Sequence, residues 1–151
     1  MTTLTASLTD LAALAAALVC SAVIGWDRES EGRAAGLRTH MMVGLGAAGF
    51  TITAWRLLEV AGGDPGRMTG AIVGGVGFLG AGSIMKAGGQ VRGLTTAAGL
   101  WVVAAIGIAC GLRHYDVAVF VSLLALATLK IVRRLEPAIH AEANEESKTV
   151  A

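Results

Sequence analysis

Charged residues are scarce in this sequence, and their scarcity argues against a soluble domain. Asp, Glu, Lys and Arg make up 15% of the 151 residues, whereas hydrophobic residues make up 54%, and the mean hydropathy is +0.66. A soluble domain of this length needs far more polar surface than these residues supply. The formal net charge is only +1, and no basic patch marks a binding surface for nucleic acid.

Cysteine and histidine are equally sparse. Cys20 and Cys110 both lie in apolar runs, where we expect small apolar filler; a disulfide requires that their two helices touch at matching depth. The three histidines have no partner at i+4 and no nearby cysteine pair, so no metal site or cofactor is predicted. Because no nucleophile has an evident histidine partner and no apolar run holds paired carboxylates, we do not expect an enzyme.

Long uncharged runs are what the sequence does have. A helix that spans a bilayer needs about 20 mostly apolar residues, so these runs predict an all-α integral membrane protein, a bundle of about five transmembrane helices. The N-terminal region carries no Lys or Arg, which is the wrong charge for a cleaved signal peptide, and we expect the first helix to be retained. The predicted spans are Leu8–Trp26, Arg38–Leu57, Met68–Met85, Leu94–Leu112 and Tyr115–Val132.

Basic residues are unevenly shared between the two sides of this bundle. One side holds nine of them and the other holds three. Since loops rich in Lys and Arg face the cytoplasm, we predict an outside N-terminus and a cytoplasmic C-terminus. The nine are Arg28, Arg33, Arg38, Lys86, Arg92, Lys130, Arg133, Arg134 and Lys148, and the three are Arg56, Arg67 and Arg113.

One domain followed by a short tail is expected. Residues 1–134 form the transmembrane domain. Beyond them the chain turns polar, and Pro137 with its Glu, Asn, Ser and Lys neighbours indicates a helix end. We predict a short, disordered cytoplasmic tail over 135–151.

The segment Gly74–Ser83 contains the G-x-G-x-x-G pattern of dinucleotide-binding folds. That site needs a preceding strand and an acidic residue about 20 positions later. Neither is present, because the preceding residues continue an apolar run and no acid occurs between Asp64 and Asp116. A nucleotide site is therefore not predicted.

A helical wheel gives these glycines another role. Gly70, Gly74, Gly77 and Ala81 share one stripe, and Gly75 and Gly82 a second. Small residues let helices approach closely in lipid, so we predict a bundle centred on a glycine-rich third helix that packs against small residues of the second and fourth. A pore lining or an unwound ion-binding segment remains the alternative. The predicted helix-packing residues are Gly70, Gly74, Gly75, Gly77, Gly80 and Gly82.

Two polar segments, residues 25–40 and 91–101, flank the spans on the predicted cytoplasmic side. Charges of both signs directly abut an apolar helix, and a cation opens the second span, where it must snorkel or pair. The segments form either a structural ion-pair network that anchors helix ends or a functional site. The candidate functional residues are Arg28, Glu29, Arg38, Thr39, Arg92, Thr95 and Thr96.

Four ordered blocks of this sequence resemble the MgtC/SapB family of bacterial inner-membrane proteins. They are Gly25-x-x-Arg28-Glu29, Ala35–Ala48, Gly75–Gly82 and Val91–Gly107. The resemblance implies a multi-pass inner-membrane protein with its N-terminus outside. Three residues depart from the family pattern. Virulence members have Asn at the position of Thr95 and Cys at that of Val102, and many members have Gln at that of Ala71. The soluble C-terminal domain of longer members does not follow, and these differences together favour a short, SapB-type form.

The resemblance also implies candidate functions. Some members are virulence factors required in low magnesium and inside macrophages, the founding protein inhibits the F-type ATP synthase, and others are linked to acid stress. We therefore expect a regulator of another membrane complex, such as ATP synthase, under Mg²⁺ limitation or acid stress. The alternatives are a transporter or channel for Mg²⁺, protons or a small solute, and a structural module that forms a homo-oligomer, with a dimer as the first expectation.

Overall fold

The computed structural model describes the backbone of residues 2–87 and 89–149, and the side chains of residues 8–86 and 89–134. Over these residues the chain forms five α-helices and one short hairpin, which confirms the predicted all-α class. The elements are α1 (Thr2–Ser30), α2 (Leu37–Ala61), α3 (Pro65–Gly82), β1 (Met85–Ala87), β2 (Gln90–Arg92), α4 (Leu94–Gly111) and α5 (Tyr115–Thr149).

Helix α3 begins and ends with clear local signals. Pro65 occupies the first turn, where its missing N–H has no cost, and the Asp64 carboxylate accepts a hydrogen bond from the Gly66 N–H at 2.8 Å. The helix ends at Gly82, so the predicted third span, which extends to Met85, is too long by three residues. Met85 instead begins β1.

The hairpin between α3 and α4 was not predicted. Strands β1 and β2 are antiparallel, with Met85 opposite Arg92 and Ala87 opposite Gln90. A Gly-Gly pair between alternating residues is a known hairpin signal, and it was present in the sequence. Gly93, which follows β2, has φ +92°, and a side chain there would overlap the Ser83 carbonyl oxygen, so the turn into α4 requires glycine.

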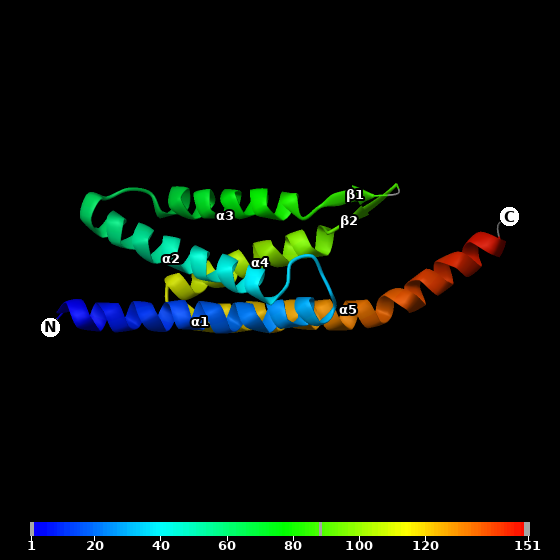
Figure 1. Ribbon diagram of the computed structural model, residues 1–151, viewed down its shortest axis with the longest axis horizontal. Coiled ribbons are helices and arrows are strands. Elements are labelled where there is room, and N and C mark those ends of the chain that lie inside the picture. The colour runs from blue at the N-terminus through cyan, green and yellow to red at the C-terminus, as the bar shows by residue number, and fades with distance from the viewer. Residues whose placement is uncertain (1, 88, 150–151) are drawn as a thin grey trace.

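The centre of the bundle is α4, not the glycine-rich third helix. Helix α4 packs against α1, α2, α3 and α5, whereas α3 packs chiefly against α4 and less extensively against α2. Figure 1 shows α3 at one edge, with α2 and α4 between it and the pair α1 and α5. The prediction of a central helix 3 is therefore wrong, because bulkier apolar residues of α4 fill the core: Leu100, Val103 and Ile106 are almost fully buried.

Among the described residues, four helices are long and apolar enough to cross a membrane. They are Leu8–Ser30, Leu37–Ala61, Leu94–Gly111 and Tyr115–Arg134. Helix α3 is not among them, because its glycines lower its hydropathy. It nevertheless returns the chain along the bundle, since α2 ends where α3 begins and α4 begins at the opposite end (Figure 1). A fifth crossing by α3 stays a prediction.

The closest helix approach is between α2 and α4. A side chain at Gly107 would overlap the Gly44 carbonyl oxygen and lie 2.8 Å from Ala47 Cβ. At Gly111 it would lie 2.7 Å from Thr51 Cβ. The G-x-x-x-G pair of α4 therefore packs on the small residues of α2, which the helical wheel assigned to the third helix.

The glycines of α3 pack differently from the prediction. Only Gly80 faces a neighbouring helix, since a Cβ atom added there would lie 3.5 Å from Ala97 Cβ. A Cβ atom added at any of the other five would have nothing within 4 Å: Gly70, Gly74, Gly75, Gly77 and Gly82. Packing within one chain is thus found at Gly80 alone, and a role for the others in contacts with a second molecule stays a prediction.

Helix α5 continues past the predicted helix end. It runs through Pro137 to Thr149, and its C-terminal part projects beyond the other helices (Figure 1). A proline removes one helical hydrogen bond, but the Ala, Glu and Lys residues around it are good helix formers. The predicted helix end is corrected accordingly. The separate cytoplasmic tail stays a prediction, and its residues 150 and 151 lie outside the described part.

Candidate functional site

A buried ion-pair network lies at the C-terminal end of α1. Arg28 is only 3% exposed, and its guanidinium donates to the Asp27 carboxylate at 2.5 and 3.1 Å and to Glu31 at 3.2 Å. Because a buried charge without a partner is strongly destabilising, these two carboxylates are what allow Arg28 to sit inside the bundle. The sequence predicted Arg28 but not its partners.

Glu31 ties this network to more distant parts of the chain. Its carboxylate also pairs with Arg33 at 3.3 Å and with Arg133 of α5. The sequence signal for this ion pair was the presence of opposite charges near the ends of two apolar helices. Which of these charges pair depends on which helices lie side by side, and the sequence did not show that. We define Asp27, Arg28, Glu31, Arg33 and Arg133 as the α1–α5 charge network.

Glu29 makes a different kind of contact from its neighbour Arg28. It is exposed and accepts a hydrogen bond from the Leu37 N–H at 2.9 Å, which satisfies one of the free N–H groups at the start of α2. A side chain at Gly36 would overlap this carboxylate. Glu29 therefore acts as a cap for α2, supplied from the end of α1.

The remaining predicted polar residues do not converge on one site. Arg38, Arg92 and Thr95 are exposed, and Thr96 is buried at 5% exposure in α4. Thr39 is exposed and lines a cleft between α2 and α3. Of the predicted set, only Glu29 is shown in a side-chain interaction that joins separate segments of the described chain. The Arg28 guanidinium pairs with Asp27 and Glu31, both at the end of its own helix.

Two fully buried polar atoms lack a hydrogen-bond partner in the described part of the chain: Ser21 Oγ and His40 Nε2. The other ring nitrogen of His40 lies 2.9 Å from the Gly36 carbonyl oxygen, so Nδ1–H donates and Nε2 of the neutral ring is left as an acceptor. Nε2 faces Gly99 of α4, and Ser21 faces Gly44 of α2. An unpaired buried polar group costs about 1–3 kcal/mol.

A second charge cluster lies near the N-terminal end of α1. Asp10 pairs with Arg56 of α2 and with Arg113 in the turn between α4 and α5, the latter at 3.2 Å. Arg113 also donates to Thr9 at 3.2 Å. We define Asp10, Arg56 and Arg113 as the Asp10 cluster. The sequence did not predict these pairings.

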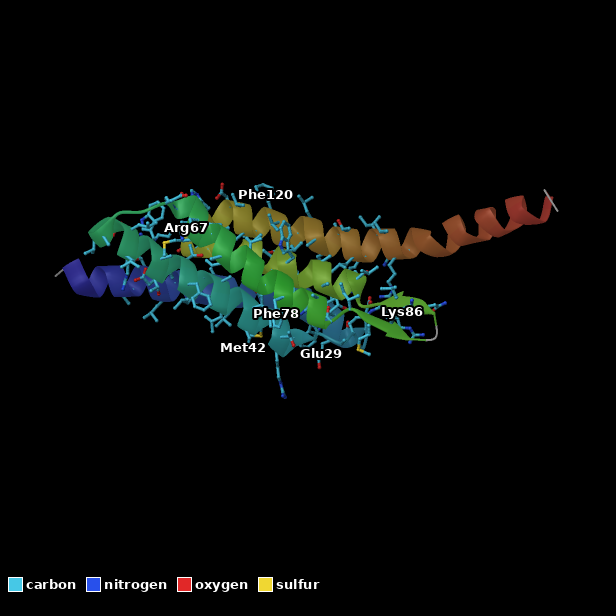
Figure 2. All side chains as sticks on the ribbon, turned by 90° about the horizontal axis from the view of Figure 1, so that it is seen from above. Glu29, Met42, Arg67, Phe78, Lys86 and Phe120 are labelled. Atoms are coloured by element: carbon cyan, nitrogen blue, oxygen red, sulfur yellow. The ribbon has the colours of Figure 1, made fainter. Side chains whose placement is uncertain are left out.

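An open cleft of about 960 Å³ lies between α2 and α3. Its lining is almost entirely apolar, with Thr39 and Thr53 on α2 and Arg67 on α3 as the polar contributors. Figure 2 shows Arg67 and Lys86 near opposite ends of α3, and Met42 on the adjoining helix. Among the described residues, no group of three His, Cys, Asp or Glu side chains is placed to hold a metal ion.

Comparison with known proteins identifies relatives over most of the chain. The sequence model of the MgtC family matches residues 14–138. The chain is 40% identical over 126 residues to an Escherichia coli protein named "Putative magnesium transporter YhiD", covering 80% of this chain and 58% of that protein. It is 42% identical over 120 residues to "Protein MgtC" of Salmonella typhimurium, covering 80% and 51%.

A third relative gives the same proportions. "Protein MgtC" of Brucella abortus is 41% identical over 124 residues, which cover 82% of this chain and 51% of that protein. The chain therefore spans about half the length of the curated relatives it matches. No solved structure matches it.

Proposed function

The chain belongs to the MgtC family of membrane proteins, and we propose that it acts without catalysis, by docking on another membrane complex and regulating it. The family resemblance makes F-type ATP synthase the candidate partner, under Mg²⁺ limitation or acid stress.

The open glycine face of α3 is the observation that carries this proposal. Gly70, Gly74 and Gly77 lie on one side of the helix, and a Cβ atom added at any of them would have no neighbour within 4 Å. In lipid, such a face lets a second helix approach closely and gain van der Waals contact. None of the three lines the α2–α3 cleft, so a partner helix has access to this face.

The buried charges support a docking role over an ion pathway. The carboxylates of Asp10, Asp27 and Glu31 each pair with at least one arginine. Intramembrane acids that carry protons or cations must be free to exchange them. Asp10 and Glu31 instead join α1 to other segments, and Asp27 neutralises the buried Arg28.

Co-purification tests the proposal directly. Tagged protein from Mg²⁺-starved cells is expected to retain subunits of the partner complex, and Gly74→Leu is expected to lose them, because a leucine blocks close approach. Gly49→Leu is the matched control, since Gly49 of α2 also has free space around it. Absence of ATP-synthase subunits, together with unchanged ATP-driven proton pumping on overexpression, would contradict that partner.

A transporter or channel for Mg²⁺, protons or a small solute is the second candidate. It is favoured by the unpaired His40 Nε2 and Ser21 Oγ in the core, and by the name of the E. coli relative. Flux into liposomes that contain the purified protein is the test. Transport is expected to fall in His40→Gln and Ser21→Ala if these atoms line a path, and an inert wild-type protein removes this candidate.

A further inference from the structure

The α2–α3 cleft has the composition of a binding site for an acyl chain. Large apolar side chains line both walls, among them Met42, Phe50 and Leu57 on α2 and Ile72 and Leu79 on α3. The volume, about 960 Å³, is at the upper end of the range typical of small-molecule sites, roughly 300–1,000 Å³. Figure 1 shows α2 and α3 diverging away from the loop that connects them.

One cation stands at an end of this apolar cleft. Arg67 lines the cleft in the first turn of α3, and Figure 2 shows it at the far end of α3 from Phe78. Its side chain is exposed and has no ion pair or hydrogen bond to any residue that the structure describes. The nearby Asp64 carboxylate is engaged by the Gly66 N–H. An apolar cleft ending in a free guanidinium complements a molecule with an apolar chain and an anionic head.

The length of the cleft distinguishes a lipid from a transmembrane helix. Its α3 wall extends from Arg67 to Leu79 and its α2 wall from Thr39 to Leu57, which is about 18 Å and about 27 Å at 1.5 Å per residue. Half of a hydrocarbon core is about 15 Å, whereas a spanning helix needs about 30 Å. The stretch that both walls enclose is limited by the α3 wall to about 18 Å. This length matches one leaflet, which is the depth that a lipid chain occupies.

We propose that the cleft binds an anionic phospholipid, with an acyl chain between α2 and α3 and its phosphate on the Arg67 guanidinium. Arginine forms charge-assisted, often bidentate hydrogen bonds to phosphate. The lining residues contain no acid to receive the ammonium of a zwitterionic headgroup, so an anionic head is preferred. The lipid is a resident ligand of the chain, separate from the partner that the glycine face of α3 would receive.

Lipid retention tests the acyl-chain site. Full-length protein is purified in a mild detergent with phosphatidylglycerol, and the bound lipid is counted by native mass spectrometry. Gly75→Leu is expected to expel it, because Gly75 lines the cleft and a leucine there fills it without clashing with the backbone. Gly74→Leu, one residue away on the open face, is the matched control and is expected to retain it.

Headgroup preference tests Arg67. The wild type is expected to prefer phosphatidylglycerol over phosphatidylcholine, and Arg67→Gln is expected to weaken the binding of phosphatidylglycerol about tenfold, as for the loss of one charged hydrogen bond. Arg92→Gln is the control, because Arg92 is exposed outside the cleft. Inorganic phosphate at the same concentration is expected not to compete, which distinguishes a lipid from a free anion.

Three outcomes overturn this proposal. The first is equal lipid retention by Gly75→Leu and Gly74→Leu, and the second is equal headgroup preference in Arg67→Gln and the wild type. The third is disulfide-linked dimers formed through Ala71→Cys in the cleft, which would identify a second copy as the occupant. The regulatory proposal fails separately, through loss or absence of partner subunits in co-purification.

Discussion

Replacement of Gly107 by alanine tests the packing of α2 on α4 at its closest point. The new methyl group would overlap the Gly44 carbonyl oxygen and would lie 2.8 Å from Ala47 Cβ and 3.1 Å from the Ala48 nitrogen. Optimal contact between carbon atoms is about 3.5–4.0 Å. The two helices must therefore separate by up to roughly 1 Å at this level.

The expected cost follows from that separation. Overpacking of a well-packed core by one methyl group destabilises by about 1–3 kcal/mol. Alanine also has a higher helix propensity than glycine, by up to about 1 kcal/mol, which partly masks the cost. Gly74→Ala is the matched control, because it gains the same propensity at a position with nothing within 4 Å. The difference in unfolding free energy between the two variants isolates the packing term.

Reversible unfolding of the purified protein in detergent or nanodiscs measures this difference. Gly107→Ala is expected to be less stable than Gly74→Ala by about 1–3 kcal/mol. Adding Ala47→Gly to Gly107→Ala removes one of the clashing carbons and is expected to recover part of the loss. Equal stability of Gly107→Ala and Gly74→Ala would refute the close α2–α4 contact.

Three further perturbations probe other contacts. Asp10→Asn is expected to lower the unfolding free energy by about 1 kcal/mol or less for each of its two ion pairs, because both arginine partners are more than half exposed. This loss of stability should shrink at high salt, and a salt-independent loss would contradict an electrostatic origin. Glu29→Ala removes the cap of α2 and is expected to cost about 0.5–2 kcal/mol, while Glu29→Gln retains an acceptor and should unfold close to the wild type. Cys20 and Cys110 are free thiols in the same hydrophobic cluster, so mild oxidation in membranes should protect both from maleimide together. Continued labelling of Cys20 in the oxidised wild type would place α1 and α4 at a different register.

Much of the helical architecture could be predicted from the sequence, because the bilayer imposes a length and a hydropathy on each spanning helix. Four of the five predicted spans coincide with helices that meet both conditions. The third span was harder to place, since glycine lowers hydropathy while leaving a helix intact. The hairpin at Met85–Arg92 was missed, because a short strand pair between helices has little hydrophobic pattern of its own.

Which helices pack against one another was harder to predict than where each helix lies in the sequence. A wheel shows that small residues share a face, but it does not show which helix that face meets. The small residues of α2 were therefore assigned to helix 3, whereas they pack on Gly107 and Gly111. Likewise, the pairing of Glu31 with Arg133 joins residues about 100 positions apart, and only the contact of α1 with α5 brings them together.

The two charge groups on α1 have a consequence for the membrane itself. Asp10 and Asp27 lie 17 positions apart on one continuous helix, which places them about 26 Å apart along its axis. Asp10 is held by two arginines from outside α1, and the network around Asp27 is tied to α5 through Glu31 and Arg133, so neither end can shift in depth alone. A typical hydrocarbon core is about 30 Å thick, and a bilayer that adapts to this distance must thin by a few ångströms. We therefore expect the ion pairs to favour a membrane with a hydrocarbon core close to this distance, and thicker membranes should strain the protein at both boundaries.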